Sequence, residues 1–216
     1  MSEKKPYDGL ARVTEIVAEI CGSPEPGWLS MCTPTQQRVG EEWPTPTEDS
    51  ILDWSSMMGT AMHETCLEGV ESQNHYVKQA KAYFDQWTAK HSPQRIEVEQ
   101  VCIHPDSLYG GTIDMLCRIG GKRYIVDLKF FGWWKEHFGY EQSKDPFPSM
   151  KSAKVNLQTN LYDLTQKRDH IRACLIIHPK GWLFHEFKRD SKHIPKALEI
   201  AKTVSRRSDK YLLHDF

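Results

Sequence analysis

Long apolar runs are missing from this chain. No stretch of its 216 residues approaches the ~18 consecutive apolar residues of a membrane-spanning helix. The first ten residues, MSEKKPYDGL, have no apolar core of the kind found in secretion signals, and their acidic residues disfavour an Arg-rich transit peptide. We therefore expect a cytoplasmic protein, in the host cytoplasm if the chain is viral, with no contact to a membrane.

Paired cysteines are missing as well. The sequence has no CxxC pair and none of the Cys and His spacings that are typical of structural zinc sites. Its cysteines are scattered as Cys21, Cys32, Cys66, Cys102, Cys117 and Cys174. We expect them to be reduced thiols, some of them buried.

Net charge is nearly absent, because two unequal halves cancel. The formal charge is −1, but residues 1–100 carry 8 basic and 16 acidic side chains, whereas residues 101–216 carry 20 and 13. Such asymmetry is typical of proteins that bind polyanions.

Apolar content of 39% and well-spread aromatic residues exclude a disordered, collagenous or coiled-coil chain.

The periodicity of apolar residues predicts a central sheet flanked by helices, in a mixed α/β or α+β fold. We expect helices over residues 10–20, 51–70, 76–90, 149–167 and 191–207, and strands over 96–103, 111–118, 122–130, 173–178 and 182–188. We expect one domain: an N-terminal helix and Pro-rich loop (1–50), a core (51–190) and a basic C-terminal helix (191–216).

The segment GGTIDMLCRIGGKRYIVDLKF, residues 110–130, is the most informative part of the chain. If Gly120 and Gly121 form a tight hairpin turn, the numbers of facing residues always add up to 241, so Asp114 faces Asp127. Facing side chains of like charge destabilise a sheet. A cation between them would remove this cost, and hard divalent ions such as Mg²⁺ and Mn²⁺ prefer carboxylate oxygens.

Two further residues extend this constellation. Lys129 lies two residues after Asp127, so strand alternation places both on one face, where an ammonium group could hold a water or offset phosphate charge. Glu99, or Glu97 with the same parity, could add a third carboxylate. The alternative is a solvent-facing hairpin with ordinary surface residues.

With these residues in place, the chain resembles the RecB-like branch of the PD-(D/E)XK nuclease superfamily, and in particular its stand-alone mitochondrial and phage exonucleases. The four motifs follow the order of that branch. They are GTAMHE (59–64) for G-x-x-x-H, GTID (111–114) for G-x-x-D, DLK (127–129) for D-x-K and QTNLY (158–162) for Q-x-x-x-Y. VTEIV (13–17) resembles a leader segment of the stand-alone members.

The resemblance implies a restriction-endonuclease-like core and metal-dependent hydrolysis of phosphodiester bonds by one nuclease domain. It implies two Mg²⁺ or Mn²⁺ ions, held by His63, Glu99, Asp114, Asp127 and the Leu128 carbonyl. By the same resemblance, Lys129 orients the attacking water, and Gln158 and Tyr162 line the active site. The alternatives are structural roles: His63 as a core or surface histidine, and Gln158 and Tyr162 as packing residues.

Two departures from the family pattern bear on these expectations. Phe130 follows the lysine where a small hydroxyl residue is common, which weakens the expected local phosphate contact. Some related nucleases hold an iron–sulfur cluster with cysteines gathered near the C-terminus. Only Cys174 lies beyond residue 117 here, so we expect no iron–sulfur cluster.

An aromatic segment, FFGWWKEHFGY (130–140), follows the D-x-K motif directly. Trp133 and Trp134 could stack on unpaired bases beside Lys135, although such rings are often buried in a core. Lys151 and Lys154 begin the helix that carries the glutamine and tyrosine, and could hold a DNA backbone near the metals.

The function predicted from these patterns is a metal-dependent DNA exonuclease acting on DNA ends or single strands. A recombination or replication protein would be a compatible partner. Two alternatives remain open: a nuclease-like protein that binds nucleic acid without cutting it, and a metal-dependent endonuclease on RNA or DNA.

Overall fold

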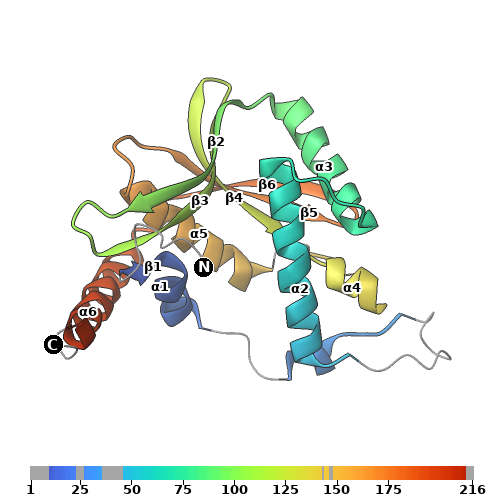
Figure 1. The fold of residues 1–216 in the computed structure, drawn as a ribbon, viewed down its shortest axis with the longest axis horizontal. Helices are drawn as coiled ribbons and strands as arrows, with labels where there is room; N and C mark the ends of the chain where they lie inside the picture. The colour runs from blue at the N-terminus through green and yellow to red at the C-terminus, as the bar shows by residue number, and fades with distance from the viewer. Residues whose placement is uncertain (1–9, 23–26, 36–45, 143, 146–147, 213–216) are drawn as a thin grey trace.

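The computed structural model describes residues 10–22, 27–35, 46–142, 144–145 and 148–212, with the backbone alone at 150 and 205–212. Its elements begin with a short strand and a run of helices, followed by a three-strand meander, two helices, a hairpin and a last helix (Figure 1). They are β1 (Ala11–Arg12), α1 (Val13–Cys21), the 3₁₀ turn η1 (Trp28–Met31), α2 (Glu48–His63), the π-helical turn η3 (Glu64–Glu68), α3 (His75–His91), β2 (Gln94–Ile103), β3 (Tyr109–Ile119), β4 (Lys122–Phe130), α4 (Trp133–Phe138), α5 (Ser149–Leu164), β5 (Ile171–His178), β6 (Gly181–Phe187) and α6 (Ile194–Leu212).

The sheet has six strands and mixed directions. Its order is β1-β3-β4-β5-β6, with β2 paired to β3 outside this path. The β2–β3, β3–β4 and β5–β6 pairs are antiparallel, whereas β1–β3 and β4–β5 are parallel. The parallel pair β4–β5 is joined through α5, which crosses over the sheet. The predicted mixed sheet between helices is therefore confirmed.

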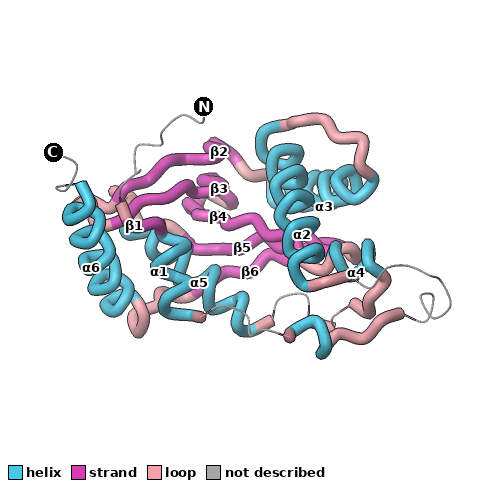
Figure 2. Tube along the Cα trace, turned by 60° about the horizontal axis from the view of Figure 1, so that its bottom comes forward, coloured by secondary structure: helices cyan, strands magenta, loops and turns pink. Residues whose placement is uncertain are grey.

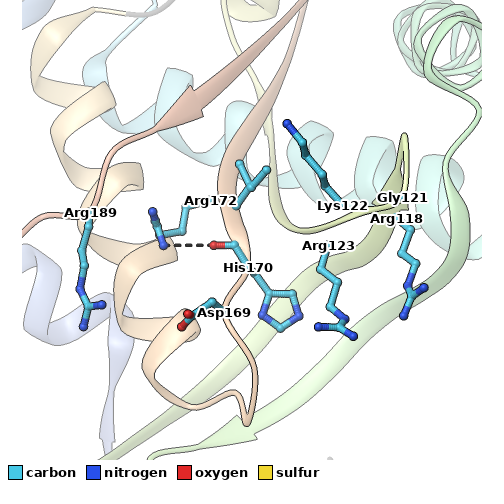
Figure 3. Close-up of a pocket in the computed structure, with 9 residues that line it drawn as sticks. Arg118, Gly121, Lys122, Arg123, Asp169, His170, Arg172 and Arg189 are labelled. Carbon is cyan, nitrogen blue, oxygen red and sulfur yellow. Dashed lines mark hydrogen bonds between the residues drawn. The ribbon is translucent and has the colours of Figure 1, made fainter.

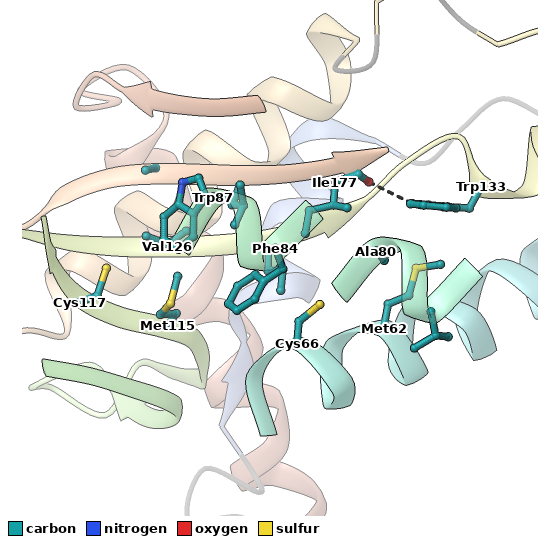
Figure 4. Packing of buried hydrophobic residues seen from close by; sticks show 14 of the residues in the cluster. Met62, Cys66, Ala80, Phe84, Trp87, Met115, Cys117, Val126, Trp133 and Ile177 are labelled. Carbon is teal, nitrogen blue, oxygen red and sulfur yellow. Dashed lines mark hydrogen bonds between the residues drawn. The ribbon is translucent and has the colours of Figure 1, made fainter. Parts of the chain in front are cut away.

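Helices cover both faces of the sheet (Figure 2). On one face, α2, η3 and α3 pack Met62, Cys66, Phe84 and Trp87 against strand residues such as Val126 (Figure 4). On the other face, α1, α5 and α6 bury their apolar stripes against β3 and β4. That second cluster includes Ile16, Ile113, Ile125, Leu157, Leu161 and Ala197.

The β3–β4 hairpin has the register that the sequence predicts. Ile119 pairs with Lys122, Arg118 with Arg123 and Met115 with Val126. The turn residues Gly120 and Gly121 have φ values of 57° and 81°, the left-handed region that a two-residue hairpin turn requires and that glycine tolerates.

Beyond Met115 the two strands separate. β1 pairs with β3 only at Tyr109 and Gly110, so residues 111–114 have no ladder partner on that edge among the described strands. Ile113 packs with the α1 side and Met115 with the α2 side, so the alternation of β3 is broken at Asp114. This opening is where the predicted site residues gather.

The element boundaries differ from the predictions in a few places. α2 begins at Glu48, inside the predicted loop, because the Thr47 hydroxyl accepts a hydrogen bond from the Ser50 backbone N–H at 3.1 Å and caps the helix. The helix predicted to reach residue 167 ends at Leu164, and the one predicted from residue 191 begins at Ile194. Strand β1 and the short helix α4 were not predicted.

Two expectations about what the chain lacks concern the described residues. All six cysteines are free, and four of them are buried. Among the helices described, none is long and apolar enough to cross a membrane.

Candidate metal centre

Four elements bring the predicted acidic cluster together. His63 ends α2, Glu99 lies in β2, Asp114 in β3 and Asp127 in β4. The His63 ring bridges two acids, with Nδ1 3.2 Å from Glu99 Oε1 and Nε2 3.3 Å from Asp114 Oδ2. One ligand atom each from His63, Glu99 and Asp114 lies within 4.8 Å of the others.

The structure brings Glu99, and not Glu97, to this cluster. Glu97 is exposed and lines a different cavity, beside Arg118. Glu99 has a φ of 50°, an uncommon backbone conformation for a residue other than glycine. A second irregularity follows His63 directly, because the chain continues as the π-helical turn η3, a feature frequent at functional sites.

Asp114 is held as a charged carboxylate. Its Oδ2 accepts a hydrogen bond of 2.8 Å from the Leu128 backbone N–H on the neighbouring strand. Burial acts to raise the pKa of Asp114, but Lys129, His63 and the Leu128 N–H outweigh burial and hold the pKa below its ordinary value. The same contact acts on His63, whose pKa is raised because its partners Asp114 and Glu99 outweigh the effect of burial.

The buried Asp127 and the half-buried Lys129 form an ion pair on one face of β4, as strand alternation predicts. Lys129 Nζ lies 2.7 Å from Asp127 Oδ2, and the Asp127 side chain is 1% exposed. Burial raises the pKa of Asp127 to about 6, although Lys129 acts to lower it. Burial acts to lower the pKa of Lys129, but Asp127 and Asp114 raise it above its ordinary value, so the amine is charged at neutral pH.

The donor set fits a divalent metal ion. It combines one imidazole with the carboxylates of Glu99 and Asp114, and hard ions such as Mg²⁺ and Mn²⁺ take such oxygen-rich sets. Within the described part of the chain, no hydrogen bond reaches the buried Oδ1 of Asp127. A buried anionic oxygen without a donor is costly, and a bound cation would remove that cost.

The centre lies beside a cavity of about 480 Å³. Besides His63, Glu99, Asp114 and Lys129, its lining includes Gly59, Thr60, Glu64, Glu68, Leu128 and Phe130. Our sequence reasoning missed Thr60, Glu64 and Glu68. Their four-residue spacing was the available signal, since it places them on one helical stripe that begins beside the G-x-x-x-H motif.

Gln158 and Tyr162 lie together on α5, below the opening between β3 and β4. Gln158 Nε2 donates a 3.2 Å hydrogen bond to the Tyr162 hydroxyl. Burial raises the pKa of Tyr162, and the charges of Asp127 and Asp114 raise it further. A Cβ at Gly111 would meet the Tyr162 ring at 2.9 Å, so the glycine of one motif makes room for the tyrosine of another.

The two tryptophans of the aromatic segment have different environments. Trp133 is 3% exposed, belongs to the core beneath α2, and donates from Nε1 to the Ile177 carbonyl at 3.1 Å (Figure 4). Its ring is therefore part of the core, which corrects the expectation that it stacks on substrate. Trp134 is half-buried and lies edge-on to Trp28, with ring centroids 5.3 Å apart.

The three lysines predicted to hold substrate lie near one another. Lys151 Nζ lies 4.3 Å from the centroid of the Phe131 ring. Burial lowers the pKa of Lys151, and the positive charges of Lys135 and Lys154 lower it further. Lys135 on α4 and Lys154 on α5 are thus near enough to Lys151 for their charges to act on it.

Comparison with known proteins identifies a shared fold and no family. No family model and no curated protein matches the chain. The crystal structure of LHK-Exo in complex with dAMP is similar, with a TM-score of 0.51 and 11% sequence identity over 96% of this chain and 92% of that one. SSO0001 is 9% identical over 90% of this chain and 84% of that one, with a TM-score of 0.37. At this identity, the likeness to LHK-Exo concerns the fold alone.

Proposed function

We propose that this protein is a metal-dependent deoxyribonuclease that hydrolyses phosphodiester bonds at DNA ends or in single-stranded DNA. The observation that carries the proposal is the cluster of His63, Glu99 and Asp114 beside the Asp127–Lys129 pair. The four sequence motifs supply these residues. The nuclease-like fold shared with LHK-Exo, whose structure holds dAMP, supports the same class of substrate.

His63, Glu99, Asp114 and Asp127 would hold the metal, with the Leu128 carbonyl as a further ligand. Two bound Mg²⁺ or Mn²⁺ ions would lower the pKa of a water and neutralise charge on the phosphate. The protein prepares this site in advance, because the Leu128 N–H fixes Asp114 and because His63 is held between two acids.

Lys129 would act directly on the reacting groups. Its charged amine, fixed by Asp127, would donate a hydrogen bond to the attacking water or to the phosphate oxygen on which charge develops. A preorganised donor needs no rearrangement during the reaction, and this is the physical reason for placing a lysine on a buried aspartate.

Substrate contacts would come from α4 and α5. Lys135, Lys151 and Lys154 would hold the DNA backbone, and Trp134 would offer a ring edge to a base. Gln158 and Tyr162 would close the site from below, with the Tyr162 phenol kept neutral by its raised pKa.

End-labelled digestion tests the proposal. Linear DNA labelled at its 5′ or 3′ end, circular DNA, and RNA of the same sequence are compared in Mg²⁺, Mn²⁺ and EDTA. We expect release of nucleotides from linear DNA with either metal, no release in EDTA, and a rate about 10³-fold lower for Asp127→Ala. Asp106→Ala, an exposed aspartate in the β2–β3 connection, is the matched control.

Three outcomes would contradict the proposal. Digestion by Asp127→Ala at the wild-type rate would show that Asp127 does not belong to the active site. Faster digestion of RNA or of circular DNA would indicate an endonuclease of a different kind. Tight binding of DNA without turnover in either metal would indicate a nuclease-like binding protein.

A further inference from the structure

The turn end of the β3–β4 hairpin carries a second pair of like charges. Arg118 and Arg123 are direct cross-strand partners, two positions from the Gly120–Gly121 turn. Like charges in facing positions destabilise a sheet. Figure 3 shows both guanidinium groups extending in the same direction, on the side where the His170 ring lies.

These arginines lie where two cavities meet. A cavity of about 590 Å³ and one of about 530 Å³ share Arg118, Arg123 and His170 in their linings. We call the joined cavities the arginine groove. Its cationic lining consists of Arg95, Arg118, Lys122, Arg123, Lys167, Arg168, Arg172 and Arg189, against the acids Glu97 and Asp169.

Most of this positive charge is not compensated by nearby acids. In the described part of the chain, Arg172 pairs with Asp163 at 2.9 Å, whereas Arg95, Arg118, Arg123 and Arg168 have no carboxylate oxygen within 4.0 Å. Partial desolvation lowers the pKa of Arg123, and the neighbouring Arg168, Arg118 and Arg95 lower it further. The groove therefore concentrates positive potential at one place on the surface.

We propose that the arginine groove binds the backbone phosphates of the same nucleic-acid strand whose reacting phosphate lies at the metal centre. This inference rests on the function proposed above. Guanidinium groups match phosphate oxygens with two parallel hydrogen bonds, and a bound polyanion would remove the repulsion between Arg118 and Arg123.

The distance between the two sites fits one strand. Arg118 lies four residues from Asp114 along β3, and Arg123 lies four residues from Asp127 along β4. At a rise of about 3.3 Å per residue, the separation is roughly 13 Å. A nucleic-acid strand in a duplex carries one phosphate per about 3.4 Å of rise, so the groove would meet phosphates about four nucleotides from the reacting one.

Val101, Ile103 and Leu116 also line the groove and would contact the apolar faces of the sugars. An acidic protein segment would gain from the charges too, but it would gain nothing from a metal centre four residues away along β3 and β4. Nucleic acid is therefore the occupant that the position of the groove favours.

The test compares Arg118→Gln/Arg123→Gln with the wild-type protein by fluorescence anisotropy in EDTA, so that binding is measured without hydrolysis. The probes are labelled single-stranded DNA of 3 and 12 nucleotides and duplex DNA of 12 base pairs. For the 12-nucleotide probes, we expect affinity to fall on the order of tenfold and the slope of log K against log salt to shrink by roughly 2. For the 3-nucleotide probe, which can contact the groove through few phosphates only, we expect a smaller loss of affinity.

Lys78→Gln/Lys90→Gln is the control, because it removes two exposed positive charges from α3, outside the groove. We expect it to leave the affinity for the 12-nucleotide DNA nearly unchanged. The melting temperature of the arginine variant should be equal to or above that of the wild type, since a repulsive pair is removed. A lower melting temperature would indicate a structural role and would overturn the inference.

Unchanged affinity for the long DNA, or an equal loss in the control, would also overturn it. So would binding of polyglutamate as tight as binding of DNA. Because anisotropy in EDTA does not depend on turnover, a protein that fails to digest DNA can still lose affinity through the arginine variant. Failure of the groove and failure of the proposed nuclease activity are therefore separate results.

Discussion

The β3–β4 hairpin has an acidic end and a basic end. Arg118 faces Arg123 near the turn, and the ladder ends at Met115 and Val126, so the predicted pairing of Asp114 with Asp127 lies beyond it, where the strands separate. Both ends place like charges side by side, which a sheet tolerates only with compensation. The two ends differ in burial, because Asp127 is 2% exposed while both arginines are half-buried.

This difference decides which counter-ion fits each end. Buried Asp127 and its partly buried neighbour Asp114 leave room only for something small, so a lysine and a histidine contact them and a compact cation would complete the set. The half-exposed arginines face an open groove, where an extended anion can approach. Charge alone does not distinguish a catalytic centre from a binding surface; charge combined with burial does.

The largest expected effect separates the two ends by function. Asp114→Asn keeps the shape of the side chain but removes a ligand charge, so we expect hydrolysis of DNA to fall by about 10³-fold or more. Binding of 12-nucleotide DNA in EDTA should change less than about threefold, because the groove is intact. The rate is measured by nucleotide release and the affinity by anisotropy.

The double variant Arg118→Gln/Arg123→Gln should show the opposite pattern to Asp114→Asn. Its affinity for DNA should be reduced, and its rate of hydrolysis at saturating DNA should be unchanged. If Asp114→Asn weakened binding in EDTA as much as the arginine variant does, the division of roles between the two ends would be wrong.

The next effect concerns β2, which carries one glutamate for each end. Glu99→Gln removes a charge from the metal centre, so we expect the dissociation constant for Mn²⁺ to rise by about ten- to a hundredfold, measured by isothermal titration calorimetry. Glu97→Gln is the matched control with the same chemical change on the same strand. Because Glu97 lines the arginine groove, its removal should leave Mn²⁺ affinity unchanged and tighten DNA binding slightly.

Equal effects of the two substitutions on Mn²⁺ affinity would show that Glu99 has no special place at the centre. That result would also leave its left-handed backbone conformation without a functional reason.

A smaller effect tests packing at the acidic end. A Cβ at Gly111 would lie 2.9 Å from the Tyr162 ring, so Gly111→Ala should lower the free energy of unfolding by about 1–3 kcal/mol, measured by urea denaturation. Gly59→Ala is the control, because nothing lies within 4 Å of its added Cβ and alanine is the better helix residue. We expect Gly59→Ala to leave stability unchanged or to raise it by up to about 1 kcal/mol.

Tyr162→Leu should relieve the crowding, so that Gly111→Ala costs less in its presence. Strictly additive effects of the two substitutions would mean that the glycine is not there to accommodate the ring.

The hairpin was predictable because its determinants are local. Two glycines specify the turn, the turn specifies the register, and strand alternation then places Lys129 beside Asp127. The same arithmetic also pairs Arg118 with Arg123, but without burial it does not show which pair faces a groove. Strand parity did not separate Glu99 from Glu97 either, and only the family resemblance named Glu99.

Features that depend on contacts between distant parts of the chain could not be predicted from the sequence. The parallel pairing of β4 with β5 depends on where α5 packs, and this is a property of the whole core. An aromatic run shows that rings cluster but not which side is buried, so Trp133 was expected at the substrate and lies in the core. The role of Gly111 depends on a ring 51 positions away in the chain.

The smallest expected effect concerns the one compensated arginine of the basic end. Asp163 accepts hydrogen bonds from Arg172 at 2.9 Å and from the His170 backbone N–H at 3.0 Å. Burial acts to raise the pKa of Asp163, but these partners hold it below its ordinary value of 3.8. A lowered pKa means that the contact stabilises the fold above the unfolded-state pKa, and that this stabilisation is lost as the pH falls through the folded-state pKa.

Asp163→Asn should therefore lower the free energy of unfolding by about 1–2 kcal/mol at pH 7, with a difference from wild type that shrinks below a pH of about 4. It should also raise DNA affinity by about twofold, because Arg172 is released toward the groove. Asp169→Asn removes the same charge from the exposed rim of the groove, and should raise affinity without changing stability. If neither substitution raised DNA affinity, the uncompensated charge of the basic end would not be what attracts the strand.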